Sequence, residues 1–473
     1  MPLPRQRLTT DLTARFATIR AAAGVAESFP PEVIELARQR ATAPPALESP
    51  HRTDRRDIEL LSIDPEGSRD LDQALAIERR GSGYRFQYAI ADVGAWVEPL
   101  DAIDVEARKR AMTIYSPDRR VPLHPPELSE GAASLLGDVD RPVVLWTIDL
   151  DQLGEIADIG VERSLVRNRR ALSYRSAQDA LDSGTADEQL RLIEEVGHLR
   201  TALEVRRGGV SLELPDQIVE PDGDRYRLRY DAALPVERWN AQLSLCCGMA
   251  AAQLMIGAGC GILRTLPAAD PTVIERLRIS STALGVAWPA EMSYPDWVHS
   301  LDADSGTGAA LMVQAARTLR GASYLPFDGD LPADHRHSAI AADYAHVTAP
   351  LRRLVDRFAN ECVLAAAGGK RPSSWALEAL PLLPELMAAG SRRANNVDRA
   401  AVDLVEAAVL THRIGTVFEA TVTSSGRGVS TIQLVDPAVI ASVAAELAVG
   451  TSVDVRLEAA DIEGPTVRFS LTV

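Results

Sequence analysis

The sequence predicts an α+β fold with a separate small β-barrel at its carboxyl end. Strand-type runs dominate residues 56–165, and helical periodicity dominates residues 176–206 and 237–412. Short β runs with glycine turns fill residues 413–473, which is typical of a five-stranded barrel of the OB type. A length of 473 residues leaves room for two to four domains.

The composition is that of an ordinary soluble globular protein, with 46% hydrophobic and 25% charged residues, so it excludes a disordered or fibrous chain. Its net charge of −16 argues against an electrostatic grip on nucleic acid along the whole chain, but allows a locally basic channel. Arginine supplies every basic residue except Lys109 and Lys370. A GC-rich genome explains this bias, and arginine also suits bidentate phosphate contacts.

Cysteine content and the chain start predict a cytoplasmic protein without a membrane partner. The four cysteines are too few for a disulfide scaffold at this length, and none lies in a CxxC zinc pair. The first residues lack the apolar segment of a secretory signal. One uncharged run, residues 243–263, is rich in alanine, glycine and cysteine, which favours a buried helix over a lipid-facing span.

We expect three segments along the chain. Residues 1–50 form a short helical segment, with helices at 12–23 and 31–41 and a Pro-rich linker at 43–50. Residues 51–412 form the large α+β domain, in which strands at 58–63, 85–90 and 143–150 surround a helix at 101–112. Residues 413–473 form the barrel.

The acidic run SIDPEGSRDLDQ, residues 62–73, is the most informative segment. Asp64, Asp70 and Asp72 follow a strand-like run, and a loop that folds back can bring them to one point. Carboxylates at this density suit Mg²⁺ or Mn²⁺, which can clamp a phosphate and activate water. The spacing does not fit an EF-hand, whereas a solvated acidic loop or a DxD nucleotide-sugar site remains open from this segment alone.

Further motifs follow in a fixed order. They are AIADVGAWV at 89–97, RAMTIYSP at 110–117, VPLHPPELS at 121–129, ALSY at 171–174 and YAHVTAPLRR at 344–353. With the acidic run, they resemble the RNB catalytic domain of ribonucleases II and R over residues 56–412. The resemblance implies a metal-dependent hydrolytic 3′→5′ exoribonuclease that acts on single-stranded RNA and releases nucleoside 5′-monophosphates.

The resemblance also implies roles for individual residues near the reaction. Asp64 and Asp70 should be ligands of Mg²⁺, for which Mn²⁺ can substitute, and Asp72 should position both the metal and the attacking water. Tyr115 should lie beside the scissile phosphate and the terminal nucleotide. Arg352 should clamp the phosphate and stabilise developing charge.

Other residues should contact the RNA, namely Arg353, Tyr174 and Asp398. Tyr174 can also be read as a core residue, and the alignment at Asp398, where the ribonuclease II pattern suggests glutamate, is loose. We interpret His346 as a structural histidine, because metal-activated water needs no imidazole base. The basic stretches 108–110, 163–170 and 392–393 can be read either as a channel mouth or as solvated faces.

Two residues depart from the family pattern. Gln73 stands where the pattern has an aspartate, so it offers a carbonyl oxygen without the charge. Leu212 stands where ribonuclease II has a stacking phenylalanine, and losing that aromatic costs roughly 1–3 kcal/mol of stacking. Fifty residues also cannot hold the two amino-terminal cold-shock barrels of the larger relatives, so we expect weaker anchoring of RNA.

The sequence therefore supports two hypotheses. The first is an active exoribonuclease, acting as a monomer without an obligate protein partner. The second is a catalytically impaired RNB protein that binds RNA 3′ ends, which Gln73 and the reduced flanking domains motivate.

Overall fold

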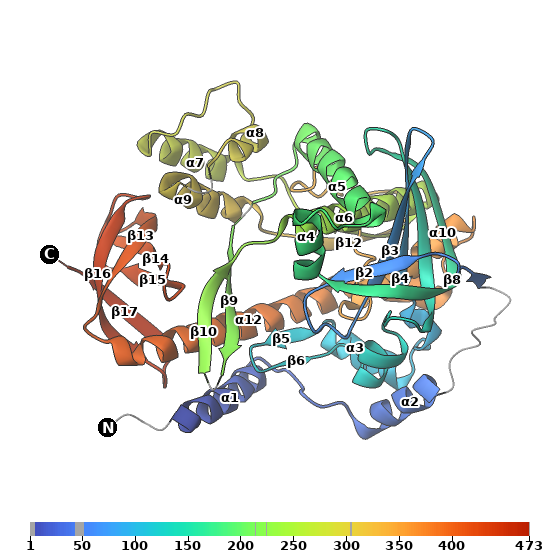
Figure 1. Ribbon diagram of the computed structural model, residues 1–473, viewed down its shortest axis with the longest axis horizontal. Helices are drawn as coiled ribbons and strands as arrows, with labels where there is room; N and C mark the ends of the chain where they lie inside the picture. Colours follow the sequence, from blue (N-terminus) through green and yellow to red (C-terminus); the bar gives the residue numbers. More distant parts are fainter. Residues whose placement is uncertain (1–4, 43–51, 213, 224, 303–304, 473) are drawn as a thin grey trace.

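The computed structural model describes residues 5–42, 52–212, 214–223, 225–302 and 305–472. It consists of a large α+β body and a small antiparallel barrel, which lie at opposite ends of the molecule in Figure 1. The predicted fold class is therefore confirmed. The predicted linker at 43–50 lies outside the described residues.

A six-stranded sheet forms the centre of the large body, in the order β1-β8-β2-β3-β4-β7. Strand β8 pairs in parallel with β1 and β2 and also antiparallel with β7, so the sheet closes on itself. Direct pairing of β2 with β8 places the last residue of β2 opposite the last residue of β8, and β3 starts beside them. The six strands are β1 Thr53–Asp54, β2 Leu60–Asp64, β3 Gln73–Arg80, β4 Gly83–Ala91, β7 Asp140–Leu150 and β8 Ile156–Ser173.

The long strand β8 was not predicted from the sequence. Its arginine-rich stretch, residues 163–170, reads as a basic surface or channel, whereas the structure places it in the middle of the sheet. Leu165 and Val166 are both buried, and the arginines that flank them, Arg163 and Arg167, form ion pairs with Asp92 and Asp140. Tertiary pairing therefore overrides the local charge pattern.

The helices α4 Tyr174–Asp182, α5 Glu188–Arg207, α6 Pro235–Ala258 and α10 Leu354–Ala367 pack around the sheet. Together with the sheet they bury one large core, which includes Phe86, Trp146 and Phe358. Within the described residues, α6 is the one helix that is long and apolar enough to cross a membrane. Its contacts with α5 and α10, and its fully buried Cys246 and Cys247, are those of a core helix.

The remaining elements of the large body form hairpins and a helical module at its periphery. They are α3 Ala102–Arg110, β5 Ile114–Ser116, β6 Arg119–Val121, β9 Asp216–Asp222, β10 Arg225–Asp231, β11 Cys260–Thr265, α7 Pro271–Ala283, α8 Tyr294–His299, α9 Gly306–Ala315, β12 Ser323–Asp328, α11 Ser374–Ala379 and α12 Leu383–Leu410. Helix α12 runs from the body to the barrel, with the β9–β10 hairpin beside it (Figure 1).

The carboxyl-terminal barrel has the strand order β15-β14-β13-β16-β17, and β15 also contacts β17, so it is nearly closed. Its strands are β13 Val417–Gly426, β14 Val429–Leu434, β15 Val439–Val443, β16 Ser452–Asp461 and β17 Thr466–Leu471. Both barrel aromatics, Phe418 and Phe469, are buried and meet edge to face at 6.0 Å. They therefore serve the barrel core and offer no stacking platform for bases.

Two helices open the described chain, α1 Arg5–Ala22 and α2 Pro31–Thr42. The buried side chains of Leu12 and Phe16 join a cluster that also includes residues of α12 and the barrel. Phe16 also meets Tyr226 of β10 edge to face. The amino-terminal segment is thus packed along the body, below α12 in Figure 1.

Candidate active site

The acidic run of the sequence forms the turn between β2 and β3. Strand β2 is buried up to its last residue, Asp64, and β3 begins at Gln73 as an antiparallel neighbour of β2. Because the chain reverses between the two strands, residues 65–72 fold back over the same edge of the sheet. The three aspartates of the run therefore lie at one edge, as the sequence predicts.

Asp72 is the most deeply held of these carboxylates, with 4% of its surface exposed. Its Oδ1 accepts a hydrogen bond from the backbone N–H of Leu351 at 2.7 Å, and its Oδ2 accepts one from Arg352 Nε at 3.2 Å. Burial raises the pKa of Asp72 to about 7, although the positive charge of Arg352 and the Leu351 hydrogen bond oppose this rise. The carboxyl group is thus balanced between its two protonation states near neutral pH.

Asp64 and Gln73 each keep one buried oxygen without a partner. Neither Asp64 Oδ2 nor Gln73 Oε1 has a hydrogen-bond partner among the described residues. Burial raises the pKa of Asp64 to about 6, the positive charge of Arg352 opposes the rise, and the negative charge of Asp70 adds to it. A buried acceptor without a partner is costly, so these two oxygens indicate a missing cation or donor at this edge.

The carboxylate of Asp70 forms an ion pair with an arginine of the same chain. Arg120 of β6 donates from Nη1 to Asp70 Oδ1 at 2.5 Å, and its Nη2 lies 3.0 Å from Glu130. Arg120 was not predicted from the sequence, because it lies between the two motifs at 110–117 and 121–129. Asp70 therefore lies at the predicted edge, but in an ion pair.

A divalent cation fits this edge in its donor chemistry. Mg²⁺ and Mn²⁺ prefer oxygen ligands, and Asp64 and Gln73 present oxygens without partners. The raised pKa values of Asp64 and Asp72 are the ones that a nearby cation would lower. Among the residues that the structure describes, however, no group of three or more His, Cys, Asp or Glu side chains has the separation of a metal site. The metal-ligand roles of Asp64, Asp70 and Asp72 therefore remain a prediction.

Tyr115 reaches the same carboxylates from the β5–β6 hairpin. Its neighbour Ile114 points into the protein interior, and Tyr115, on the opposite face of the short strand, is 53% exposed. Partial burial of the phenol and the negative charge of Asp70 raise the pKa of Tyr115 to about 12. The phenol is therefore a neutral hydrogen-bond donor at physiological pH.

The loop that carries Arg352 is fixed from behind by a buried ion pair. Arg353 donates from Nε and Nη2 to the two oxygens of Asp356, at 2.6 and 2.8 Å. Asp356 Oδ2 also accepts the backbone N–H of Ala349 at 2.7 Å, so one carboxylate holds both ends of residues 349–353. Arg353, predicted to contact RNA, is thus committed to Asp356, a residue that the sequence analysis missed.

His346 lies behind the same loop. Its Nδ1 and the hydroxyl of Tyr324 are 2.8 Å apart, and the ring meets Tyr344 edge to face. Burial lowers its pKa well below the usual value, so the ring is neutral. These contacts agree with the interpretation of His346 as a structural histidine.

Tyr174 lies close to the carboxylate edge, at the end of β8. The register of the parallel pair β2–β8 places Ser173 opposite Asp64, and Tyr174 then begins α4. Its hydroxyl accepts a hydrogen bond from Asn240 Nδ2 at 3.3 Å, and the negative charge of Asp64 contributes to its raised pKa, of which burial is the main cause. The structure thus brings Tyr174 to the predicted site, partly buried.

Asp398 and Leu212 lie elsewhere. Asp398 lines a cavity of about 740 Å³ between β9, α12 and the barrel, where its neighbours include Asp216, Asp403 and Glu406. Repulsion from Asp216 adds to the burial that raises the pKa of Asp398. The acidic residues of the cavity repel phosphate, but Arg399 also lines it, and the RNA contact at Asp398 stays a prediction. Leu212 packs against the apolar cluster of the helical module formed by α7–α9.

The basic stretches are largely used in internal ion pairs. Arg110 pairs with Glu106 at 2.9 Å, Arg163 pairs with Asp92 at 3.1 Å, and Arg167 pairs with Asp140 at 2.7 Å. These partners neutralise much of the charge that a channel mouth would need. Arg110, Arg163 and Arg167 therefore help to fix α3 and β8 in the fold.

The fold and the carboxylate edge define a class of two-domain proteins, in which an α+β body with an acidic edge is joined to a small antiparallel barrel. The RNB domain matches residues 52–367, and the RNase II-type exonuclease C-terminal S1 domain matches residues 416–472. The chain belongs to the RNB family.

Two curated relatives show the range of this family. Ribonuclease R of Escherichia coli is 24% identical over 401 residues, which cover 79% of this chain and 48% of the relative. A protein of Arabidopsis thaliana named "Inactive exonuclease DIS3L2" is 28% identical over 359 residues, which cover 68% of this chain and 34% of the relative. The chain thus spans about half of the first relative and about a third of the second.

A solved structure confirms the architecture. RNase R of Mycoplasma genitalium, in complex with ribose-methylated single-stranded RNA, matches with a TM-score of 0.87 at 17% identity. The match covers 98% of this chain and 78% of that one, so both the α+β body and the barrel share its fold.

Proposed function

We propose that this chain is a 3′→5′ exoribonuclease that uses Mg²⁺, or Mn²⁺ in its place, to hydrolyse single-stranded RNA to nucleoside 5′-monophosphates. The observation that carries the proposal is the contact of Asp72 with Leu351 and Arg352, which lie 279 and 280 residues away in the chain. Two distant motifs of the RNB family thus meet at one buried carboxylate. Tyr115 and Asp64 act electrostatically on the same groups.

In this proposal, Asp72 holds the attacking water and accepts its proton. A bound Mg²⁺ would lower the raised pKa of Asp72 and keep the carboxylate ionised, so that it can accept a proton. Each of its oxygens already accepts one hydrogen bond and keeps a second lone pair for the water. The Leu351 N–H and Arg352 fix the orientation of the carboxylate, so the water is presented in one direction.

Arg352 and Tyr115 receive the phosphate. The guanidinium of Arg352 uses Nε for Asp72, so its two terminal nitrogens can donate to phosphate oxygens as negative charge develops. The neutral phenol of Tyr115 can donate to the same phosphate or to the terminal ribose. Asp64, Asp70, Asp72 and the Gln73 carbonyl are the groups that would hold Mg²⁺, which when bound polarises the phosphate and activates water.

The decisive test is a cleavage assay on single-stranded RNA labelled at its 5′ end, with Mg²⁺, Mn²⁺ or EDTA. A metal-dependent ladder that shortens from the 3′ end, with mononucleotide release, is the expected result. A matched DNA oligonucleotide should resist cleavage, because a narrow site selects ribose through its 2′-OH. Cleavage of DNA at the same rate would contradict the ribose selection.

A second function is favoured by two observations, namely a catalytically impaired protein that holds RNA 3′ ends. Gln73 replaces a carboxylate of the family pattern, and Asp70 is neutralised by Arg120. Both changes reduce the negative charge that attracts a divalent cation. Retained binding to an RNA 3′ end, without product in any Mg²⁺ or Mn²⁺ lane, would favour this function over the first.

A reducing cytoplasmic compartment and a monomeric state complete the proposal. All four cysteines are free and buried, which suits a compartment in which thiols remain reduced. Sedimentation analysis of the purified chain measures the mass in solution. A mass near 51.0 kDa would support the monomer.

A further inference from the structure

The last turn of helix α1 carries an arginine, Arg20, that is buried against the hairpin of Tyr115. Arg20 is 1% exposed, although arginine is almost never fully buried without charged partners. Its Nη1 donates to Ser116 Oγ at 2.9 Å and to Asp118 Oδ1 at 2.5 Å, and its Nη2 donates to Asp118 Oδ2 at 3.1 Å. One guanidinium therefore holds the residue after Tyr115 and the turn of the hairpin in a bidentate grip.

The same guanidinium also fixes the chain that leaves α1. Arg20 Nε donates to Glu27 Oε1 at 2.7 Å, and Arg119 of the hairpin donates to Glu27 Oε2 at 3.1 Å. Four charged groups, two from the amino-terminal segment and two from the hairpin, thus form a closed network. This ion-pair network is neutral overall, and its buried half is the pair of Arg20 and Asp118, whereas Arg119 and Glu27 are partly exposed.

Apolar contacts support the ion-pair network on the inner face of the hairpin. Ile114 and Val121 are buried in a small cluster with Val397 of α12, against which Ile19 and Val25 pack. The hairpin has only three residues in each strand, so its own hydrogen bonds cannot fix it strongly. Its position is therefore set by α12 on one side and by the amino-terminal segment on the other.

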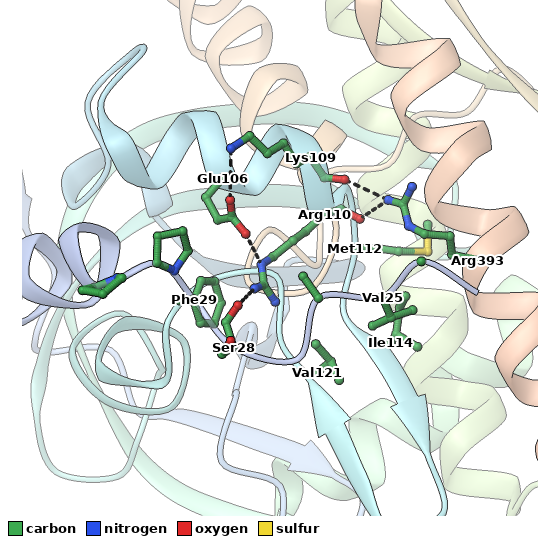
Figure 2. Close-up of a pocket in the computed structure, with 14 residues that line it drawn as sticks. Val25, Ser28, Phe29, Glu106, Lys109, Arg110, Met112, Ile114, Val121 and Arg393 are labelled. Carbon is green, nitrogen blue, oxygen red and sulfur yellow. Dashed lines mark hydrogen bonds and ion pairs between the residues drawn. The ribbon is translucent and has the colours of Figure 1, made fainter. Parts of the chain in front are cut away.

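A second arginine anchors the segment that follows α1, and Figure 2 shows it. Arg110 donates to the Ser28 carbonyl at 2.7 Å and to Glu106 at 2.9 Å, and its guanidinium lies 3.7 Å from the centre of the Phe29 ring. These contacts border a cavity of about 470 Å³ that Ile114 and Val121 also line. Because a cavity adjoins the hairpin here, packing alone does not hold this side, and the ion pairs of Arg20 become more important.

We propose that Arg20 is a positioning residue, which acts through Asp118 and Ser116 to keep Tyr115 at the catalytic carboxylates. The amino-terminal segment is then a part of the active site's support, not an appendage. The proposal rests on the proposed function where it concerns the reaction, but the placement of Tyr115 can be measured without any activity. Loss of the Arg20 contacts should let the hairpin move, and a displacement of about 1 Å can reduce a rate up to about 100-fold.

The first test uses the fluorine spectrum of the protein labelled with 3-fluorotyrosine. The chain has nine tyrosines, and Tyr115→Phe assigns the signal of Tyr115 by its loss. We expect Arg20→Met to shift or broaden that signal, and Arg20→Lys, which keeps the charge but loses the bidentate grip, to do so less. An unchanged Tyr115 signal in Arg20→Met would overturn the proposal, whether or not the protein cleaves RNA.

Two controls separate positioning from general loosening of α1. Leu12→Ala weakens the packing of the same helix at its other end, against the cluster shared by α12 and the barrel. Arg38→Met removes an exposed arginine of α2 that pairs with Glu127. Both variants should leave the Tyr115 signal in place, and an equal shift in Leu12→Ala would assign the effect to helix docking instead. If Arg20→Met does not fold, Asp118→Asn breaks the same grip from the hairpin side.

The second test is a double-mutant cycle in the cleavage assay. Arg20→Met should lower kcat about tenfold in the wild-type background and should have little further effect once Tyr115 is alanine. Equal effects in the two backgrounds would show that Arg20 does not act through Tyr115. If the wild-type protein cleaves no RNA, the proposed function fails, and the fluorine spectrum alone still decides the role of Arg20.

Discussion

Two regions of the molecule gather carboxylates, and their surroundings differ. One is the edge formed by Asp64, Asp70 and Asp72, and we call it the catalytic edge. The other is the cavity between β9, α12 and the barrel, lined by Asp216, Asp398, Asp403 and Glu406, and we call it the acidic pocket. In both regions burial raises carboxyl pKa values. Acidity and burial alone therefore do not distinguish a catalytic group from a structural one.

The partners of the carboxylates do distinguish them. In the acidic pocket, Glu406 Oε1 accepts from Gln217 Nε2 at 2.7 Å and from the Ile440 N–H at 3.0 Å, so α12 is tied to β9 and β15. At the catalytic edge, Arg352 stabilises the charge of Asp72, while the oxygens of Asp64 and Gln73 stay without partners. Free acceptors beside a fixed guanidinium can bind a ligand, whereas satisfied acceptors hold the fold together.

The largest expected effect comes from neutralising one acid in each region. Asp72→Asn should reduce RNA hydrolysis about 100-fold or more, since it removes the charge and proton acceptor at the reacting phosphate. RNA affinity should change little, because the other residues proposed to contact RNA stay in place. Asp403→Asn, the matched change in the acidic pocket, should leave the rate unchanged. Single-turnover cleavage and RNA binding are measured for both variants. A near wild-type rate in Asp72→Asn would show that Asp72 is not the catalytic carboxylate.

The next largest effect is expected from removing the arginine of each region. Arg352→Met should lower the cleavage rate about 10- to 100-fold, because it removes the phosphate donor and the partner of Asp72 Oδ2. Arg399→Met removes the arginine that lines the acidic pocket and should leave cleavage intact. Rates at saturating RNA measure the difference. If both variants lost activity equally, the acidic pocket would also belong to the RNA path.

The catalytic edge was predictable from sequence to the extent that its residues are neighbours in the chain. Asp64, Asp70 and Asp72 lie within nine residues after a buried strand, so one turn brings them together. Arg352 was assigned only through the family motif around it. Its contact with Asp72 joins residues 280 apart, and no local pattern encodes such a contact.

The parts that sequence did not predict depend on long-range pairing. Nothing in the sequence around Arg120 indicates that it pairs with Asp70. Asp356 has the position of an ordinary acidic residue in the first turn of α10. Asp398 was assigned from a loose alignment, and its acidic surroundings combine Asp403 and Glu406 of its own helix with Asp216, which only the packing of β9 brings close. Predicting such residues requires the topology, because each partner comes from a distant strand or helix.

Replacing one glutamine by an acidic residue in each region tests whether added negative charge strengthens metal binding at the catalytic edge alone. Gln73→Asp should lower the half-saturating Mg²⁺ concentration about three- to tenfold, because it adds negative charge at a position where a buried oxygen has no hydrogen-bond partner. Binding of Mn²⁺, followed by electron paramagnetic resonance, should tighten in parallel and needs no turnover. Gln217→Glu in the acidic pocket should change neither titration. Weaker Mn²⁺ binding by Gln73→Asp would show that the edge is arranged around the amide.

The smallest effect is on stability, and it concerns Glu406. Burial raises its pKa above the ordinary value of about 4.3, so between those two pKa values the folded protein binds more protons than the unfolded one. Stability from this group is therefore present at low pH and decreases as pH rises through the window. Glu406→Gln, which can keep a carbonyl acceptor for Gln217 and Ile440, should flatten this decrease and change stability by less than about 1 kcal/mol at neutral pH. Tm values measured from about pH 5 to pH 8 test this, with the exposed Glu446→Gln as control. A steeper fall of Tm with pH in Glu406→Gln than in the wild type would mean that the ionised carboxylate, not its hydrogen bonds, joins α12 to the barrel.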